Sequence, residues 1–395
     1  MRDEARVLAV ASDAGSARVL IPVARTMLTR GVGVRAAVSG PAEGIVRAEL
    51  PEVDSVPVRD ETAGAVVEEL ITRDRFDVIV TGAGSYNVLE HAARLAARAV
   101  GIPSVAVLDY WFEYHARFHR GCDGIDVESW PDLVCALDDI TRQGVIAAGC
   151  PPDRIVVTGA PNLEASQLWW RTDGHTSRRA LAEKFNVTPD RVVLAFFSEP
   201  YFAKPDGRLM DGAGGLYDSA GNPRFGYTAV QMLTCVVDAL ERATLPGHTG
   251  PQVIVKAHPL EWARPLHDFA ASRQSSPVSV VVVEDANPKE LVALADAVVG
   301  MSSVTLLEAA LVGKTAVSVQ IGLTDAAPFD PCIGNALGMT VPVRDEHELD
   351  TEMTAIITGR TPRAGHTIGL QVDGAAARVV DAVLRQATFY RRTTA

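Results

Sequence analysis

Two adjacent serines and one glutamate lie where a strand pattern changes into a helical pattern late in the chain. Ser302 and Ser303 follow the apolar run 296–299, and Glu308 lies further along the helical stretch. A serine at this place caps the helix, and the free N–H groups of residues 301–304 can bind a phosphate. From its position, the Glu308 carboxylate can accept hydrogen bonds from a ribose diol. The stretch predicts a nucleoside-diphosphate site; the alternative is a capped surface helix whose Glu308 faces solvent.

Further polar residues follow two apolar runs in the same half of the chain. Ser198 and Glu199 come directly after the run that ends at Phe197, and His258 comes soon after the run 252–256. The carboxyl ends of parallel strands meet at one edge of a sheet, where open α/β sheets bind their ligands. We therefore predict that His258 stands at the same edge as the serines, and we place Ser198 and Glu199 in the same nucleotide site.

Acidic residues follow apolar runs in the first half as well, where they can act as a general base. Asp13 follows the run 6–11 and opens a helical pattern, so it either caps that helix or takes a proton from a ligand. Asp109 lies in the segment 108–118, which also holds five aromatic residues. Aromatic rings there can stack on a sugar ring or a base, whereas the alternative is an amphipathic segment packed into the core.

The elements that position these residues are short β-branched runs that alternate with helical patterns rich in Ala, Leu and Arg. The strands predicted in the first half are 6–11, 33–38, 77–80, 104–108, 132–136 and 154–157, with helices such as 17–29 and 87–99 between them. The second half repeats this pattern with strands at 191–197, 252–256, 278–283, 296–299 and 315–319. Strands that are apolar throughout indicate a parallel sheet covered on both faces.

A polar, tryptophan-containing stretch at 163–187 separates the two series and is predicted to be a linker. The fold class is therefore α/β, with two Rossmann-like, doubly wound domains that face each other across a cleft. The predicted domains are residues 1–165 and 176–372, and a final helix within 373–395 is expected to pack back on the first domain. The glycine-rich insert 206–224 has no periodicity and reads as a long loop.

Composition limits the partners and the compartment. The chain has 395 residues, 47% of them apolar, and a net charge of −12. This charge argues against a protein that binds nucleic acid or an anionic membrane surface. Neither a signal peptide nor a membrane span is predicted, so we expect no integral membrane association and a cytoplasmic location. Five cysteines without CxxC spacing indicate neither a zinc site nor a disulfide framework. No metal and no cofactor are predicted, and the oligomeric state stays open, a homodimer included.

At the serines and Glu308 the chain resembles the GT-B superfamily, which includes inverting glycosyltransferases and the hydrolysing nucleotide-sugar 2-epimerases. The spacing of Ser302, Ser303 and Glu308 is similar to the nucleotide-binding signature of that superfamily. Residues 256–259, Lys-Ala-His-Pro, are similar to a motif of the epimerases, CDP-glycerol transferases and some sialyltransferases. The resemblance implies that the serines and Glu308 hold the diphosphate and ribose and that His258 contacts the phosphate.

Two departures from the epimerase pattern favour a transferase. The epimerases carry an aspartate in the turn that here reads Gly82-Ala83-Gly84, and they carry an arginine in the first loop, where this chain has residues 11–15, Ala-Ser-Asp-Ala-Gly. Alanine cannot move a proton, which counts against epimerisation. Asp109 lies near the place of an epimerase carboxylate, so that alternative stays open.

We therefore predict a metal-independent glycosyltransferase that moves a sugar from a nucleotide-activated donor to a hydroxyl of a small-molecule or glycan acceptor. In this hypothesis the second half binds the nucleotide sugar, and His258 stabilises the departing diphosphate. The first half binds the acceptor, and Asp13 or Asp109 removes its hydroxyl proton. The alternatives are a hydrolysing nucleotide-sugar 2-epimerase, with UDP-N-acetylhexosamine as an example of its substrate, and a non-catalytic nucleotide-sugar binder.

Overall fold

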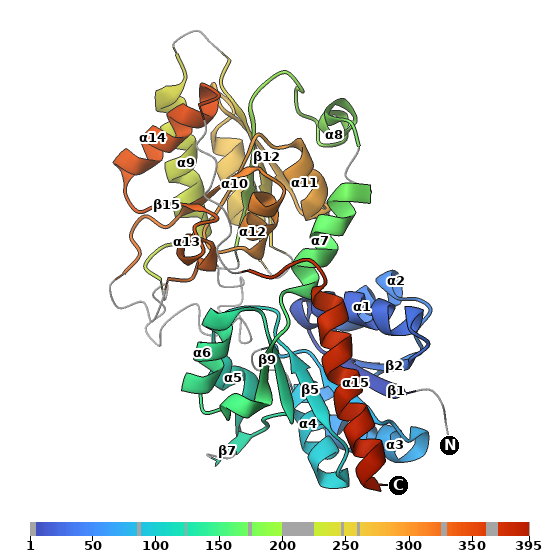
Figure 1. Cartoon of the computed structure of the whole chain (residues 1–395). Helices are drawn as coiled ribbons and strands as arrows, with labels where there is room; N and C mark the ends of the chain where they lie inside the picture. Colours follow the sequence, from blue (N-terminus) through green and yellow to red (C-terminus); the bar gives the residue numbers. More distant parts are fainter. Residues whose placement is uncertain are drawn as a thin grey trace. The chain divides into compact units, whose positions relative to one another are not determined.

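The computed structural model describes residues 5–84, 88–122, 125–172, 176–199, 225–245, 249–258, 261–324, 330–360 and 370–394. The glycine-rich insert 206–224, predicted to be a loop, lies outside the described residues. The chain divides into two compact units, one made of Met1–Ala165 and Gly369–Ala395 and the other of Ser166–Ile368. Each unit contains a parallel sheet with flanking helices (Figure 1).

The first unit is built on a seven-stranded parallel sheet in the order β3-β2-β1-β4-β5-β8-β9. Its strands are β1 (Arg6–Ala11), β2 (Gly33–Val38), β3 (Ser55–Pro57), β4 (Val78–Thr81), β5 (Ser104–Val107), β8 (Leu133–Ala136) and β9 (Ile155–Val157). The strand order runs outward from β1 and β4 in opposite directions. Ligands of open α/β sheets bind at such a change of direction, so the turns after β1 and β4 are the first candidates for a site in this unit.

Helices cover both faces of this sheet because successive residues of a strand point to opposite sides. Val7 of β1 lies in one apolar cluster with α1 (Ala14–Thr29) and α15 (Ala375–Thr394), whereas Leu8 lies in another with α3 (Ala63–Asp74) and α4 (Val88–Val100). The other helical elements of the unit are α2 (Gly40–Glu49), η1 (Asp60–Thr62), α5 (Tyr114–Phe118), α6 (Asp139–Ala147), η2 (Pro152–Arg154) and the beginning of α7 (Pro161–Thr172).

Helix α15 completes the first unit from the far end of the sequence. Its residue Val379 is buried in the same apolar cluster as α1 and β1. Near the C-terminus of the helix, Arg391 forms an ion pair with Asp77 at 2.7 Å. Asp77 is the residue that precedes β4. At its beginning the Glu164 carboxylate accepts the N–H of Ala376 at 2.8 Å, and an acid is favourable at that end of a helix.

The second unit is built on a six-stranded parallel sheet in the order β12-β11-β10-β13-β14-β15. Its strands are β10 (Val193–Phe197), β11 (Gln252–Lys256), β12 (Ser279–Val283), β13 (Ala297–Gly300), β14 (Thr315–Val319) and β15 (Val341–Val343). Its helices are the rest of α7, α8 (Arg178–Lys184), α9 (Ala229–Ala243), α10 (Arg264–Ser272), α11 (Pro288–Leu294), α12 (Val304–Leu311), α13 (Ile333–Ala336) and α14 (Glu346–Ile357). Here the change of direction falls between β10 and β13, where Glu199 and Ser302 follow the two strands.

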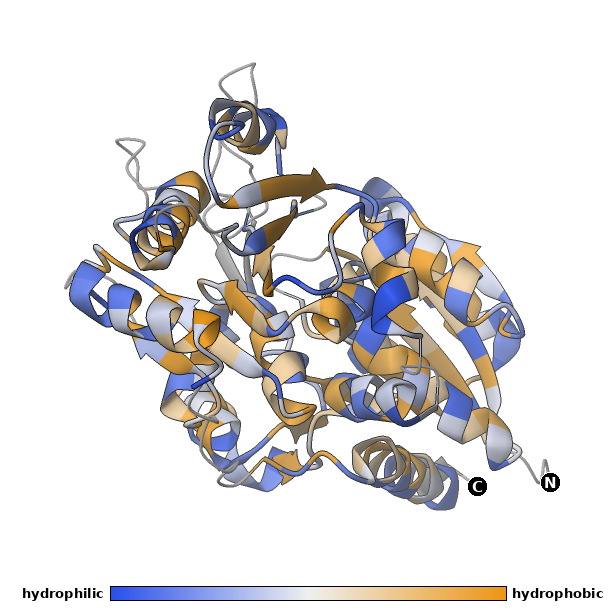
Figure 2. Ribbon diagram, turned by 90° about the horizontal axis from the view of Figure 1, so that it is seen from above, coloured by the Kyte–Doolittle hydropathy of each residue, from blue (hydrophilic) through white to orange (hydrophobic). Residues whose placement is uncertain are grey.

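Every strand predicted from an unbroken apolar run is present, with ends that differ by no more than two residues. Figure 2 shows these strands as largely hydrophobic ribbons, whereas the helices carry both hydrophobic and hydrophilic residues. The edge strands β3 and β15 and the antiparallel hairpin of β6 (His119–Cys122) and β7 (Ile125–Glu128) were not predicted.

The stretch 163–187, predicted to be a linker, holds the boundary between the two units. Most of this stretch forms α7 and α8, and its polar residues cover the exposed sides of these helices. The final helix, predicted within 373–395, spans Ala375–Thr394 as α15.

Candidate functional site

The carboxylate of Glu199 lies at the N-terminus of α12 in the second unit. Its Oε1 accepts the N–H of Ser302 at 2.5 Å, and its Oε2 accepts the Ser302 hydroxyl at 2.6 Å. Glu199 follows β10 and Ser302 follows β13, so the contact spans the change of direction in the sheet. The backbone and hydroxyl donors of this turn therefore bind an anionic group, and that group is a carboxylate of the chain itself.

The other two residues of the predicted diphosphate and ribose site belong to α12. Ser303 is the N-cap of this helix, and its hydroxyl oxygen accepts the N–H of Thr305 at 3.3 Å, which confirms the predicted cap. Glu308 accepts the hydroxyl of Ser166 on its Oε1 at 2.5 Å. The alternative in which Glu308 merely faces solvent is therefore wrong, because a side chain of α7 holds it.

Ser198 and His258 are joined through Glu261, a residue that the sequence did not single out. The Ser198 hydroxyl donates to Oε1 of Glu261 at 2.8 Å, and the backbone N–H of His258 donates to Oε2 at 3.2 Å. Burial raises the pKa of Glu261 to about 7, and the charge of Glu199 adds to this rise, against the opposing effect of the two hydrogen bonds. A carboxyl group with such a pKa can hold or release a proton near neutral pH.

A buried lysine, Lys256, lies close enough to Glu261 for its charge to act on that carboxyl group. Lys256 ends β11, and its Nζ donates to the carbonyl oxygens of Ala257 at 2.6 Å and Glu284 at 2.7 Å. Its charge lowers the pKa of Glu261 and so opposes the effect of burial. Because β11, β10 and β13 are neighbours in the parallel sheet, the turns that carry His258, Glu199 and Ser302 stand at one edge.

A second polar network in this unit follows β14 and β15. The Asn335 side-chain amide donates to Oδ2 of Asp330 at 3.1 Å and to Oε1 of Gln320 at 3.3 Å. Arg344 pairs with Asp330 at 2.5 Å and also bonds to Gln320. These groups bind one another, so the network stabilises the two turns at this side of the sheet.

In the first unit a buried glutamate of α4 joins the turns after β1 and β4. Glu90 accepts the N–H of Ser12 on Oε1 at 3.1 Å and the N–H of Gly84 on Oε2 at 2.9 Å, and it is 0% exposed. Burial, followed by the charge of Asp13, raises the pKa of Glu90 to about 7, whereas Arg94 lowers it. A glutamate thus spans the change of direction in this sheet too.

Asp109, a predicted base, lies in an ion pair with Arg117. The distance from Arg117 Nη1 to Asp109 Oδ1 is 2.7 Å, and the two side chains are 6% and 15% exposed. Burial raises the pKa of Asp109 despite the neighbouring guanidinium, and the charge of Asp13 adds to the rise. Arg117 also donates to the carbonyl oxygens of Phe112 at 2.7 Å and of Ala83, so it ties the turn after β5 to the turn after β4.

Asp13, the other predicted base, is the N-cap of α1. Its Oδ1 accepts the N–H of Ser16 at 2.7 Å, as expected for a capping aspartate. A Cβ at the adjacent Gly15 would lie 2.0 Å from Oδ2 of Asp109, so glycine is what lets the two turns approach each other. The structure therefore brings Asp13 and Asp109 together at one edge of the first sheet, with Glu90 beside them.

The prediction that the aromatic segment 108–118 faces a ligand is wrong for two of its rings. Trp111 is buried and donates its Nε1–H to Oδ2 of Asp138 at 2.6 Å. Phe118 is buried and stacks on Trp130 with ring centroids 4.4 Å apart. Large rings are most stable inside when their polar atoms find partners there. Asp138 also accepts the N–H of Thr141 at 2.7 Å and so caps the start of α6.

Sequence reasoning missed the buried charged residues of the first unit, although α4 carried a signal for two of them. Glu90 and Arg94 lie four residues apart on the side of α4 that also carries Leu89, Ala93 and Ala97, all of them buried. An acid and a base at this spacing on an apolar helix face indicate a polar group held inside the fold. Arg117 and Glu261 had no comparable signal, because the contacts with Ala83 and Ser198 join them to turns elsewhere in the sequence.

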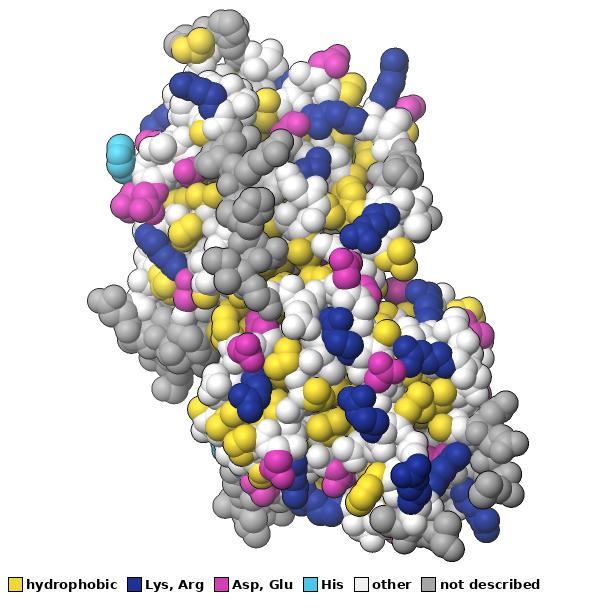
Figure 3. Space-filling model, viewed as in Figure 1, with side chains coloured by type: hydrophobic (Ala, Val, Ile, Leu, Met, Phe, Trp, Pro, Cys, Tyr) yellow, Lys and Arg dark blue, Asp and Glu magenta, His cyan; other side chains and the backbone are white. Residues whose placement is uncertain are grey.

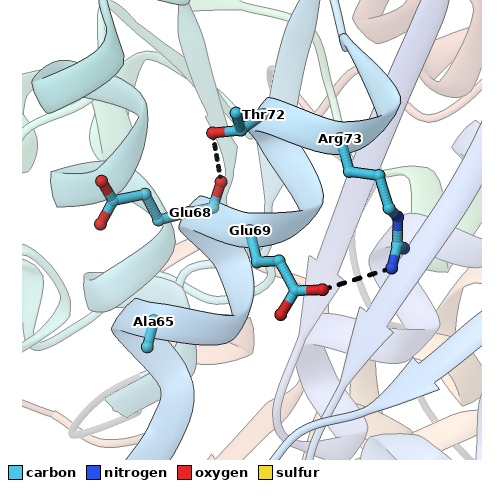
Figure 4. Close-up of a pocket in the computed structure, with 5 residues that line it drawn as sticks. All are labelled: Ala65, Glu68, Glu69, Thr72 and Arg73. Atoms are coloured by element: carbon cyan, nitrogen blue, oxygen red, sulfur yellow. Dashed lines mark hydrogen bonds and ion pairs between the residues drawn. The ribbon is translucent and has the colours of Figure 1, made fainter.

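Two hollows on the described surface lie away from these turns. One is on the outer face of α3 and is lined by Ala65, Glu68, Glu69, Thr72 and Arg73 (Figure 4). In it Arg73 pairs with Glu69 at 3.4 Å, as is typical of a solvated helix face, so we do not assign it a ligand.

The other hollow lies on α15 and is lined by Asp381, Leu384, Arg385, Thr388, Phe389 and Arg392. On the face shown in Figure 3, Lys and Arg side chains lie interspersed with Asp and Glu.

Within the described part of the chain, no group of three or more His, Cys, Asp or Glu side chains is arranged to hold a metal ion. Among the same residues, no helix combines the length and the apolar character needed to cross a membrane.

No family model and no curated protein matches the chain. Solved structures match it over nearly its whole length.

One of them is UDP-GlcNAc 2-epimerase from Neisseria meningitidis bound to UDP-GlcNAc. Its TM-score is 0.66 and its sequence identity 13%, and the match covers 96% of this chain and 100% of the epimerase chain. A glycosyltransferase from Rickettsia africae has a TM-score of 0.57 at 13% identity and covers 100% of this chain and 97% of its own. MurG from Acinetobacter baumannii has a TM-score of 0.50 at 12% identity, with 96% and 99% covered. The chain therefore has the two-domain α/β fold of the GT-B superfamily, which these epimerases and transferases share.

Proposed function

We propose that this protein is a nucleotide-sugar enzyme, specifically a metal-independent glycosyltransferase that moves a sugar from a nucleotide-activated donor to a hydroxyl of a small-molecule or glycan acceptor. The observation that carries the proposal is the anion-binding turn after β13, where Ser302 binds a carboxylate at the N-terminus of α12. A phosphate oxygen uses the same kind of donors. Proteins of the same fold include one whose structure holds UDP-GlcNAc, which supports a nucleotide sugar as the ligand.

In this proposal the second unit binds the donor. Its diphosphate lies against Ser302 and His258, whose donors stabilise the negative charge that develops on the leaving group. Ser303 fixes the start of α12, and Glu308 accepts hydrogen bonds from the ribose hydroxyls. Ser198 and Glu199 line the neighbouring turn after β10.

The first unit binds the acceptor, and a carboxylate there removes the proton of the attacking hydroxyl. Asp13 and Asp109 are the candidates, since both lie at the carboxyl edge of the sheet. The raised pKa of Asp109 makes its carboxylate a stronger base than an ordinary aspartate, although the ion pair with Arg117 restrains it. The acceptor hydroxyl then attacks the anomeric carbon, and the nucleoside diphosphate leaves.

A hydrolysing nucleotide-sugar 2-epimerase is the second candidate, and Glu90 favours it. The turn after β4 has no acid of its own, but the Glu90 carboxyl reaches the N–H of Gly84 from α4. Together with Asp109 it supplies two carboxyl groups of raised pKa near one sheet edge. Two such groups are what proton removal and return on a sugar ring require.

The test is incubation of the purified protein with UDP-GlcNAc and other nucleotide sugars, with and without a panel of hydroxyl acceptors. A transferase releases the nucleotide together with a glycosylated acceptor, which mass spectrometry detects. Release of free hexosamine without an acceptor identifies the epimerase chemistry instead. Calorimetric binding of a nucleotide without any turnover identifies a binding protein. If UDP, GDP, dTDP, CDP and CMP all fail to bind, the nucleotide-sugar proposal is wrong.

A further inference from the structure

Each unit places a glutamate across the change of direction in its sheet, but the two glutamates are held differently. Glu90 comes from the first turn of α4, is 0% exposed and accepts backbone N–H groups from two separate turns. Glu199 comes from the loop after β10, is half-buried, and binds the N–H and the hydroxyl of Ser302. Glu90 is thus built into the core, whereas Glu199 is half-buried and reaches its partner from just beyond the end of β10.

We propose that Glu199 is a specificity-determining residue that competes with the donor diphosphate for Ser302. Its carboxylate satisfies the donors of the turn until a phosphate oxygen takes its place and the Glu199 side chain turns away. This inference rests on the proposed function, because it assigns a role to one residue of the same nucleotide site.

The competition follows from the number of donors and from charge. One N–H and one hydroxyl of Ser302 bind the two oxygens of a single carboxylate, so a phosphate at the same groups must replace that carboxylate. Two anions at contact distance also repel each other. The second carboxyl group nearby, Glu261, already has a pKa that the charge of Glu199 helps to raise, so further negative charge is unfavourable there.

The consequence is selection for ligands that bring their own anion. A nucleoside without phosphates has no group that can take over the donors of Ser302, so it gains nothing from displacing Glu199. A diphosphate, in contrast, replaces the Glu199 carboxylate at Ser302 with one of its own anionic oxygens. Loss of the Glu199 charge is therefore expected to strengthen the binding of diphosphates and to leave the binding of a nucleoside unchanged.

The experiment is calorimetric titration of the full-length protein and its Glu199→Gln variant with UDP, inorganic pyrophosphate and uridine. Glutamine has the same shape, and its amide can still accept from the N–H and donate to the hydroxyl of Ser302. We expect UDP and pyrophosphate to bind at least about tenfold more tightly to the variant, because the loss of one charge at contact distance near a surface has a larger effect than that. We expect uridine to bind equally to both. Glu346→Gln, which removes an exposed charge of α14, is the matched control and should change nothing.

Thermal unfolding checks that each variant is folded. If Glu199→Gln does not fold, Glu199→Asp replaces it, since the shorter side chain keeps the charge but withdraws it from Ser302; tighter UDP binding is expected again. Equal or weaker binding of UDP to the folded variant, with normal binding to the unmodified protein, overturns the inference and leaves the proposed function standing. If none of UDP, GDP, dTDP, CDP and CMP binds either protein, the proposed function and this inference both fail.

Discussion

The hydroxyl of Ser166 donates a hydrogen bond to the carboxylate of Glu308 at 2.5 Å, which ties α7 to the middle of α12. The residues around Glu308 on α12 are buried and apolar, among them Leu307 and Ala309. Ser166 therefore orients an acid that would otherwise have little polar company. Only Oε1 takes part in this bond, so in the proposed nucleotide site Oε2 is the oxygen that we expect to accept from a ribose diol.

Replacement of Glu308 by alanine is expected to weaken UDP binding about tenfold or more, since hydrogen bonds to charged groups contribute about 1.5–3 kcal/mol. The same variant should lose any preference for UDP over 2′-deoxy-UDP. Calorimetry with the two nucleotides measures both effects. Ser166→Ala is the matched control, because it removes the partner and keeps the carboxylate, and it should retain the preference. An unchanged preference in Glu308→Ala would show that the ribose is bound elsewhere.

Asp13→Asn and Asp109→Asn, made singly, identify the general base. Asparagine caps a helix as well as aspartate does, so Asp13→Asn should keep the bond to the Ser16 N–H and a normal melting temperature. If one of the two aspartates is the base, its asparagine variant should lose roughly 10²- to 10⁴-fold in turnover, with little change in the affinity for the donor. Turnover is measured as nucleotide release in the presence of acceptor. If neither variant is impaired, no aspartate of this edge acts as the base.

Glu90 should make the first unit less stable as the pH rises. Its pKa in the folded protein is about 7, above the ordinary value of 4.5, so the folded state keeps a proton that the unfolded state loses between these values. The stabilising contribution of the protonated carboxyl is complete below pH 4.5 and is lost as the pH rises through about 7. The linked change is about 3 kcal/mol at most.

Glu90→Gln should remove this pH dependence. Hydrogen exchange of the β1 and β4 amides at pH 5 and pH 8 reports on the first unit by itself, and protection should fall with pH in the unmodified protein but not in the variant. Glu68→Gln, on the exposed face of α3, is the control and should behave like the unmodified protein. If the hydrogen-exchange protection of all three proteins changed with pH in the same way, Glu90 would not be the source of the pH dependence.

Asp138→Ala should destabilise the first unit without touching a proposed ligand contact. It removes the N-cap of α6 and leaves the Trp111 indole N–H without its acceptor inside the core. A lost cap costs about 1 kcal/mol and an unsatisfied buried donor about 1–3 kcal/mol, so we expect a loss of about 2–4 kcal/mol. Denaturant unfolding followed by tryptophan fluorescence measures it. Asp139→Ala, at the next and exposed position, should have a much smaller effect.

Most of the fold was predictable because its central strands are buried on both faces. Such strands read as continuous apolar runs, and this explains why β1, β11 and β14 have the predicted bounds. The edge strands β3 and β15 have only three residues each, and each contains a proline, so no run of this kind marks them. Helix α7 was missed because its polar and exposed residues hide the short buried side that holds Leu163 and Ser166.

The candidate site was predictable only where a residue follows a strong strand. Ser302, His258 and Asp109 were found by that rule, because the carboxyl end of a parallel strand places them at the edge of the sheet. Other contacts join residues far apart in the sequence: Glu90 of α4 binds the turn after β1, Ser166 of α7 binds Glu308, and Glu199 binds Ser302. No local pattern shows which of these distant carboxyl or hydroxyl groups will meet.

Helix α15 also determines the order in which the protein can finish folding during its synthesis. The core of the first unit contains Val379, Val380 and Val383, which are synthesised after the whole of the second unit. The second unit is one continuous segment, Ser166–Ile368, and is complete before they emerge. Domains usually fold as they are made, from the N-terminus onward. Here the first unit is closed only after the second unit has been made, so the nascent chain exposes one side of the first sheet until α15 has emerged.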